Sequence, residues 1–171
     1  MKKKLFKNIL IGLGVILVAI QFFRPTRNLG ADTGHDITTK FKVPDSVQQI
    51  LKTSCNDCHS NSTMYPWYTN LQPVGWWLQH HINEGKRGLN FSEFATYRIA
   101  KQYDRFKGIE KLVKEEEMPL KSYTLIHRYA ILNDVQKDVL IKWAVAEQDS
   151  FKANYPADSL VMPKRRGPKK S

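Results

Sequence analysis

The hydrophobic residues of this chain form one long run near the N-terminus and several shorter groups with helical spacing. From Ile9 to Phe23 the chain is almost entirely apolar, interrupted only by Gly12, Gly14 and Gln21. Further along, apolar residues recur three or four positions apart, which places them on one face of an α-helix. No alternation of apolar and polar residues extends beyond four positions. The pattern therefore predicts an all-α protein with an apolar N-terminal segment.

Helix boundary signals divide the body of the chain. Pro44 opens a short helix that runs towards Cys55, and Pro73 opens a second helix that ends near Gly85 and Gly88. Two pairs of residues have capping-box spacing and predict the starts of a third and a final helix. These pairs are Asn90 with Glu93, and Asn133 with Gln136.

Two of these helices have a predicted buried face. In the second helix the i, i+3, i+4, i+7 spacing is occupied by Val74, Trp77, Leu78 and His81. In the final helix the predicted inner face consists of Val135, Val139, Leu140 and Trp143. The stretch 60–72 is rich in Asn, Ser, Thr, Pro and aromatic residues, and this composition predicts a loop.

The N-terminal run has the features of an export signal. Three lysines follow Met1 and give a positive segment ahead of the apolar stretch. More basic residues precede the run than follow it, which favours an uncleaved anchor with its N-terminus inside. We therefore expect a single pass through the bacterial inner membrane, with the domain on the periplasmic side. A signal peptide that is cleaved to release the domain into the periplasm is the alternative.

The charge distribution argues against nucleic-acid binding. The formal net charge is +11, but residues 1–27 hold six basic and no acidic groups, and residues 164–171 hold five and none. The rest of the chain is neutral, whereas a nucleic-acid-binding domain carries its charge on a folded surface. The chain is thus divided into a signal or anchor (1–27), a linker (28–42), one domain (43–150) and a basic tail (151–171).

The sequence Cys55-Asn56-Asp57-Cys58-His59 is the C-x-x-C-H signature of covalent haem attachment. Two thiols one helical turn apart can each add to a vinyl group on one edge of the porphyrin. The adjacent His59 then offers an imidazole nitrogen to the iron. Both cysteines of the chain are used, so the motif predicts one covalently attached haem c.

Three other uses of the two cysteines remain open. Cys55 and Cys58 could form a disulfide or a pair of buried thiols, although so short a loop would constrain little of the fold. A zinc site would need a second pair of ligands, which the sequence lacks. A thioredoxin-like redox pair would need a βαβ context, which an all-α chain does not provide.

Met118 is the favoured second axial ligand. It precedes Pro119 between helical segments, and a thioether on such a loop is a suitable sixth ligand whose Met/His coordination suits electron transfer. His81 is the rival ligand, since it lies on the apolar stripe beside Trp77. Both Trp77 and His81 are also candidate pocket residues.

From Pro44 to Trp143 the chain resembles the haem-binding domain family of exported bacterial proteins, which is related to mono-haem cytochromes c. The similar stretches are CNDCHSNSTMYPWY (55–68), QPVGWWLQHHINEGKRGLNFSEF (72–94), EEMPLKSY (116–123) and ILNDVQKDVLIKW (131–143). The resemblance implies covalent haem at Cys55 and Cys58, with His59 as proximal ligand. It also makes Met118 similar to the Met-Pro ligand of cytochromes c, and matches a His-x-x-x-Gly element to His81 and Gly85.

We expect an electron carrier rather than an enzyme, with a redox partner protein that the sequence does not identify. The alternative is a haem-based enzyme or sensor with an open sixth position, such as a small peroxidase or a gas sensor. A thiol or zinc module without haem is the third possibility.

Overall fold

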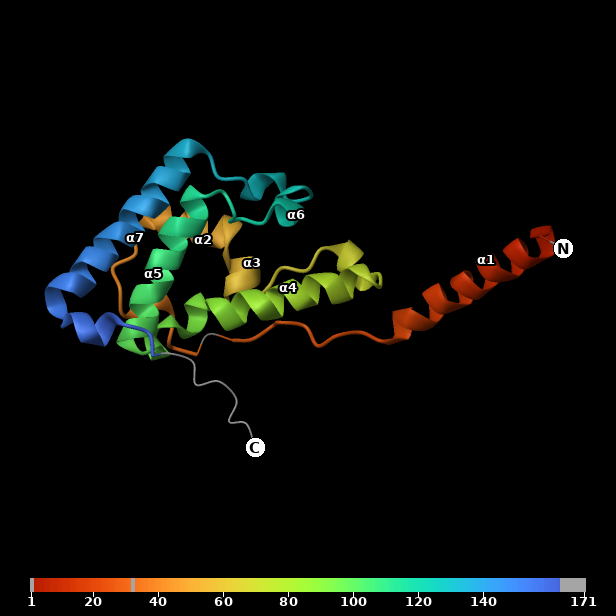
Figure 1. Cartoon of the computed structure of the whole chain (residues 1–171), viewed down its shortest axis with the longest axis horizontal. Helices are drawn as coiled ribbons and strands as arrows, with labels where there is room; N and C mark the ends of the chain where they lie inside the picture. Colours follow the sequence, from red (N-terminus) through yellow and green to blue (C-terminus); the bar gives the residue numbers. More distant parts are fainter. Residues whose placement is uncertain (1, 32, 164–171) are drawn as a thin grey trace, which may run out of the picture. The chain divides into compact units, whose positions relative to one another are not determined.

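The computed structural model describes residues 2–31 and 33–163. The basic residues 164–171 of the predicted tail, and Met1, lie outside these described residues. Within the described ranges there are helices and one isolated bridge but no strand, which confirms the all-α prediction. The α-helices are α1 (Lys2–Ala19), α2 (Asp45–Ser54), α3 (Asn56–His59), α4 (Val74–Gly88), α5 (Ile99–Lys114), α6 (Lys121–Thr124) and α7 (Asp134–Asn154) (Figure 1). The 3₁₀ helices are η1 (Ile20–Phe22), η2 (Ile37–Thr39), η3 (Trp67–Asn70), η4 (Phe91–Thr96), η5 (Arg128–Ala130) and η6 (Ala157–Leu160).

The chain forms two compact units. Unit 1 contains residues up to 31 together with 57–90, and unit 2 contains 32–56 together with the residues from 91 onwards. Each unit is thus assembled from two separate parts of the sequence. The predicted domain boundaries follow the order of the chain and do not anticipate this division.

Unit 2 is built around a cluster of aromatic rings. The rings of Phe41, Phe94 and Phe106 meet edge to face with centroids 5.2–5.5 Å apart. Phe151 of α7 stacks on Phe41 at 5.9 Å, and Trp143 meets Phe106 at 5.3 Å. Such pairs add to the stabilisation that burial of the rings provides. Helices α5 and α7 lie side by side (Figure 1), and they contribute Phe106, Trp143 and Phe151 to the cluster.

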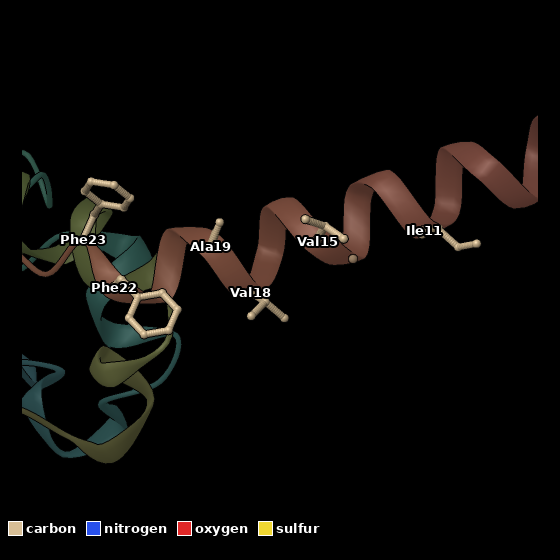
Figure 2. A pocket seen from close by; sticks show the side chains of 7 residues that line it. Ile11, Val15, Val18, Ala19, Phe22 and Phe23 are labelled. Atoms are coloured by element: carbon tan, nitrogen blue, oxygen red, sulfur yellow. The ribbon is translucent and has the colours of Figure 1, made fainter.

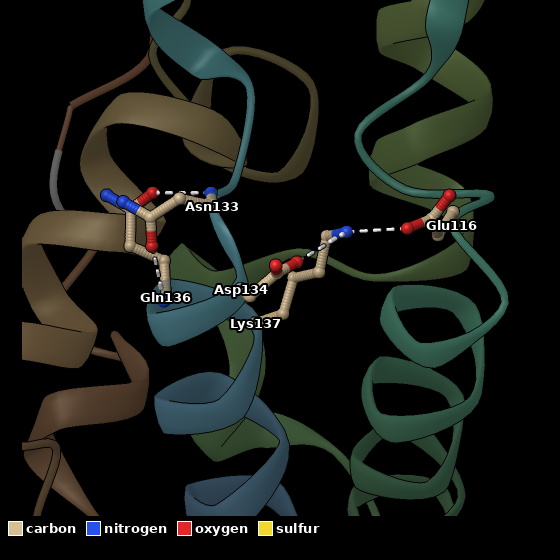
Figure 3. A network of polar contacts seen from close by, with 5 residues as sticks. All are labelled: Glu116, Asn133, Asp134, Gln136 and Lys137. Atoms are coloured by element: carbon tan, nitrogen blue, oxygen red, sulfur yellow. Dashed lines mark hydrogen bonds and ion pairs between the residues drawn. The ribbon is translucent and has the colours of Figure 1, made fainter.

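The predicted capping box at the start of α7 is confirmed. The Asn133 side chain accepts a hydrogen bond from the Gln136 backbone N–H at 2.9 Å, and the Gln136 side chain accepts one from the Asn133 N–H at 3.0 Å (Figure 3). One position further, the Lys137 ammonium forms ion pairs with Glu116 at 2.5 Å and with Asp134 at 3.5 Å. The pair between Lys137 and Glu116 ties the first turn of α7 to the segment that follows α5. The helix continues to Asn154, four residues beyond the predicted end of the domain at residue 150.

The start of the third predicted helix is wrong. Instead of an α-helix from Asn90, the chain forms η4 over Phe91–Thr96 and begins α5 only at Ile99. The Asn90 side chain donates to Asn61 Oδ1 at 2.8 Å. Phe91 and Phe94 are both buried, and their spacing of three residues matches the three residues per turn of a 3₁₀ helix.

The predicted buried stripe of α4 is displaced by one residue. Val74 and Trp77 are 41% and 46% exposed, and the buried residues are Gly75, Leu78, Gln79 and Ile82. Helix α4 packs against η3, where a Cβ on Gly75 would collide with the Thr69 carbonyl oxygen and the Gln72 side chain. The polar Gln79 is buried because its side chain is hydrogen-bonded, so hydrophobicity alone selects the wrong face.

The N-terminal helix α1 is apolar and solvent-exposed, and its length and composition would allow it to cross a membrane. After α1, an isolated bridge joins Leu29 to Ser62 within unit 1. Asn28 is buried there, and Ile37 is buried in unit 2. The predicted linker 28–42 is therefore partly packed within the two units.

Candidate functional site

The Cys-x-x-Cys-His segment begins where α2 ends. Cys55 follows the last residue of α2, and the next four residues form the single α-helical turn α3. The two cysteines are half-buried and are not joined in a disulfide. The division between the units falls between Asn56 and Asp57, so Cys55 belongs to unit 2, and Cys58 and His59 belong to unit 1.

The orientation of the His59 ring is fixed by two backbone carbonyls. Its Nδ1 lies 3.1 Å from the carbonyl oxygen of Gly85 and 3.0 Å from that of Leu89. Carbonyl oxygens can only accept, so Nδ1 carries the hydrogen and donates it to both. In the neutral ring this tautomer places the lone pair on Nε2. A histidine that binds a metal through one nitrogen characteristically donates its other N–H to a carbonyl or carboxylate, so His59 fits the role of an axial ligand.

Gly85 lets α4 cross closely over the motif. A Cβ at this position would lie 2.6 Å from the Cys58 carbonyl oxygen and 3.2 Å from the Cys58 Cβ. Any side chain would therefore push α4 away from Cys58, and would also move the carbonyl that accepts from His59. Gly85 lies inside α4, and the helix ends at Gly88, the second of the two glycines at which its end was predicted.

Burial sets the protonation states of the two motif residues in unit 1. Burial, assisted by the neighbouring Asp57 carboxylate, raises the pKa of the Cys58 thiol to about 11. At neutral pH this thiol is therefore protonated, and a thiol is a weaker nucleophile than a thiolate. Burial also lowers the pKa of His59 against the opposing effect of its hydrogen bonds to Leu89 and Gly85. The imidazole is thereby kept neutral, as metal ligation requires.

A network of buried polar side chains supports the loop that follows the motif. The Asn28 amide donates to the Ser60 carbonyl and to the Thr63 hydroxyl, both at 2.9 Å, and its oxygen accepts from the Lys86 ammonium at 2.5 Å. The Tyr65 hydroxyl donates to Gln79 of α4 at 2.7 Å. These bonds connect the segment that contains Asn28, the loop after the motif and α4, all within unit 1.

Trp77 and His81 lie together on α4, in the same unit as His59. The His81 Nδ1–H donates to the Trp77 carbonyl at 2.8 Å, and the two rings lie 4.3 Å apart. His81 is half-buried and stands one helical turn before Gly85. Their predicted roles as pocket residues, and that of His81 as a ligand, stay predictions.

Met118 belongs to unit 2. It lies between α5 and α6, it is half-buried, and its backbone N–H donates to the Leu112 carbonyl at 3.1 Å. Its role as the sixth ligand stays a prediction. The described residues contain no group of three or more His, Cys, Asp and Glu side chains arranged to hold a metal ion.

Two groups in the site could not be predicted from the sequence. The carbonyls of Gly85 and Leu89 orient His59, and a backbone acceptor leaves no trace in the identity of its own residue. The one available signal is Gly85 itself, because a glycine inside a helix often marks a close approach of another backbone. That signal is easily confused with a helix end.

The sequence model of the haem-binding domain family matches residues 15–146. This range contains the whole Cys-x-x-Cys-His motif, all of α4 and Met118. Neither a curated protein nor a solved structure matches the chain. The match extends over most of the chain, and the chain therefore belongs to the haem-binding domain family.

Proposed function

We propose that this protein carries one covalent haem c on Cys55 and Cys58 and transfers single electrons at the outer face of the bacterial cytoplasmic membrane. The observation that carries the proposal is the fixed tautomer of His59, whose Nδ1–H donates to two backbone carbonyls. Bound haem would supply the iron that accepts and releases an electron. Haem binding itself is a property of the family.

The residues around the motif have distinct parts in this function. The thiols of Cys55 and Cys58 would each form a thioether, and His59 would ligate the iron through Nε2. The two carbonyl acceptors make the imidazole a stronger electron donor, which favours the oxidised state of a bound metal. Gly85 keeps α4 close enough for one of those carbonyls to reach His59.

Helix α1 would hold the protein on the membrane. Its apolar stretch follows Lys2, Lys3 and Lys4 and precedes Arg24 and Arg27, a distribution that keeps the N-terminus on the cytoplasmic side. The residues that follow Arg27 would then lie on the periplasmic side, in the compartment where c-type haem is attached.

A pyridine haemochrome spectrum tests the covalent attachment. The full chain is produced together with the cytochrome c maturation machinery, and the haem is then extracted with acidified solvent. We expect a c-type spectrum and haem that stays with the protein, whereas Cys55→Ala and Cys58→Ala each lose one thioether and the double variant loses covalent haem. Haem that is extracted from the unaltered chain would contradict the proposal.

Met118 is the proposed sixth ligand, and its test separates an electron carrier from an open-site enzyme or sensor. We expect the ferric protein to show the weak long-wavelength band of Met–iron coordination, and Met118→Ala to lose it while His81→Ala keeps it. A low-spin ferric spectrum that lacks this band in the unaltered chain, and that becomes high-spin in His81→Ala but not in Met118→Ala, would assign His81 instead. Absence of the band together with rapid binding of cyanide and carbon monoxide would favour the open-site function.

A further inference from the structure

A long stretch of unit 1 carries no charged side chain. Residues 60–83 contain no Asp, Glu, Lys or Arg, but they include three tryptophans and two tyrosines. Several large apolar side chains of this stretch are exposed, with Trp67 at 76% and Leu71 at 51%. We call this set the aromatic surface; it consists of Trp67, Leu71, Val74, Trp76 and Trp77. Exposed apolar side chains gathered in a stretch without charge make this part of unit 1 a candidate interaction site.

The aromatic surface is joined directly to the end of α1. The Gln21 side chain donates to the Gln72 carbonyl at 3.1 Å and accepts from the Gln72 N–H at 2.9 Å. The Trp76 indole N–H donates to the Phe23 carbonyl at 2.6 Å. These three bonds place the start of α4 beside the point where α1 ends, within one compact unit.

The same point carries further apolar and basic groups. Figure 2 shows Phe22 and Phe23 at the end of α1, beyond Val18 and Ala19, with their rings directed to different sides. The two rings are 83% and 69% exposed. Arg27 follows closely and donates to Asn70 at 2.6 Å. Apolar residues, then aromatic rings, then arginines is the order in which a membrane-spanning helix leaves the bilayer.

We propose that the aromatic surface of unit 1 lies in the headgroup region of the same membrane that α1 crosses. The occupant is lipid, because the surface is continuous with a membrane-length helix and presents no charge that would have to lose its hydration. Tryptophan is well suited to this zone, since its ring is apolar and its indole N–H is polar. The inference rests on the proposed anchoring role of α1 and adds a second, lateral membrane contact.

Quenching by brominated lipid tests this placement with the tryptophans as natural probes. The full haem-loaded chain is reconstituted into vesicles of phosphatidylethanolamine and phosphatidylglycerol, with or without bromine near the headgroup end of the acyl chains. Haem quenches the tryptophan fluorescence in both preparations, so the quantity compared is the further loss of fluorescence that bromine causes. We expect bromine to lower the fluorescence, and Trp67→Phe and Trp77→Phe each to remove part of that effect.

Trp143 provides the matched control, because it is 6% exposed in the core of unit 2 and Trp143→Phe should leave the bromine effect unchanged. Gln21→Leu keeps α1 apolar but removes both bonds to Gln72, so we expect this variant to stay in the vesicles with weaker quenching. If the unaltered chain stays in the vesicles after a high-salt alkaline wash but bromine does not lower its fluorescence, the placement of the aromatic surface is refuted and the anchoring by α1 is not. Release of the chain by the wash would refute the anchoring role of α1 as well.

Discussion

The two units of this protein are stabilised in different ways. In the described part of unit 2, the buried apolar residues are Ile37, Val43, Val47, Ile50, Leu51, Phe91, Phe94, Phe106, Ile109, Val113, Ala130, Leu132, Leu140, Trp143, Ala144 and Phe151. In the described part of unit 1 they are Leu78 and Ile82. The buried polar residues of unit 1 are more numerous, namely Asn28, Ser60, Thr63, Thr69, Gln72, Gln79 and Asn90.

Unit 2 is thus held together mainly by a hydrophobic core, whereas unit 1, which contains His59, relies more on buried hydrogen bonds. Burial of apolar surface is the dominant favourable contribution to folding, while a typical hydrogen bond contributes only about 1 kcal/mol net. Unit 1 therefore has little hydrophobic stabilisation of its own. It also contains His59, so we expect a bound porphyrin to supply much of the missing apolar contact.

The largest expected effect comes from the core of unit 2. Phe106 is fully buried and its ring meets Phe41, Phe94 and Trp143. Phe106→Ala should lower the free energy of unfolding by about 3–5 kcal/mol, through lost burial and a cavity. Urea unfolding followed by circular dichroism measures it. Trp67→Ala is the exposed control, for which we expect a change within about 0.5 kcal/mol.

Gly85→Ala should have the next largest effect and should act on unit 1. Its Cβ would press on Cys58, and overpacking of this kind costs roughly 1–3 kcal/mol. We expect lower stability together with a lower yield of haem-loaded protein. Gly88→Ala is the matched control, because nothing lies within 4 Å of its added Cβ. Higher helix propensity should stabilise that variant by up to about 1 kcal/mol, and equal effects of the two substitutions would refute the crowding at Gly85.

The capping box of α7 gives a smaller effect confined to unit 2. Asn133→Ala removes the acceptor for the Gln136 N–H and should cost about 1 kcal/mol. Thermal unfolding of the haem-free chain measures the loss. Asn133→Ser or Asn133→Asp should restore most of the stability, since each supplies another capping oxygen.

The smallest effect is a dependence of stability on pH through His59. Its folded pKa lies below the ordinary value of 6.5, so the unfolded chain takes up a proton first as the pH falls. Stability of the haem-free chain should therefore decrease as the pH drops below about 6.5. His59→Gln should make the decrease shallower between pH 6.5 and 5. An unchanged slope in that variant would show that other groups cause the dependence.

Features of the fold that depend on the identity of side chains were predictable from the sequence, whereas features that depend on backbone contacts were not. The motif, the all-α class and the α7 capping box are encoded in side-chain identity, and the last two are confirmed. The buried face of α4 was predicted one residue away, because Gln79 is buried through its bond to Tyr65. The capping pair Asn90 and Glu93 predicted an α-helix too early, since the residues after Asn90 form the 3₁₀ helix η4 and α5 begins only at Ile99.

The site itself was only partly predictable. Cys55, Cys58 and His59 are recognisable by spacing, but the carbonyls of Gly85 and Leu89 are supplied by the backbone and depend on how α4 crosses the motif. The division of the chain into two interleaved units arises from contacts between residues far apart in sequence, which local patterns do not encode.

If haem is attached as proposed, the hydrogen bonds from His59 to Gly85 and Leu89 would also impose an order on its attachment. These residues follow His59 by 26 and 30 positions. In the proposed topology, a chain translocated progressively after its anchor presents the Cys-x-x-Cys-His segment to the periplasm before α4 emerges. During that interval the imidazole is not yet clamped and Cys58 is not yet covered. The attachment machinery would thus meet an open substrate, and the arrival of α4 would close the site behind it.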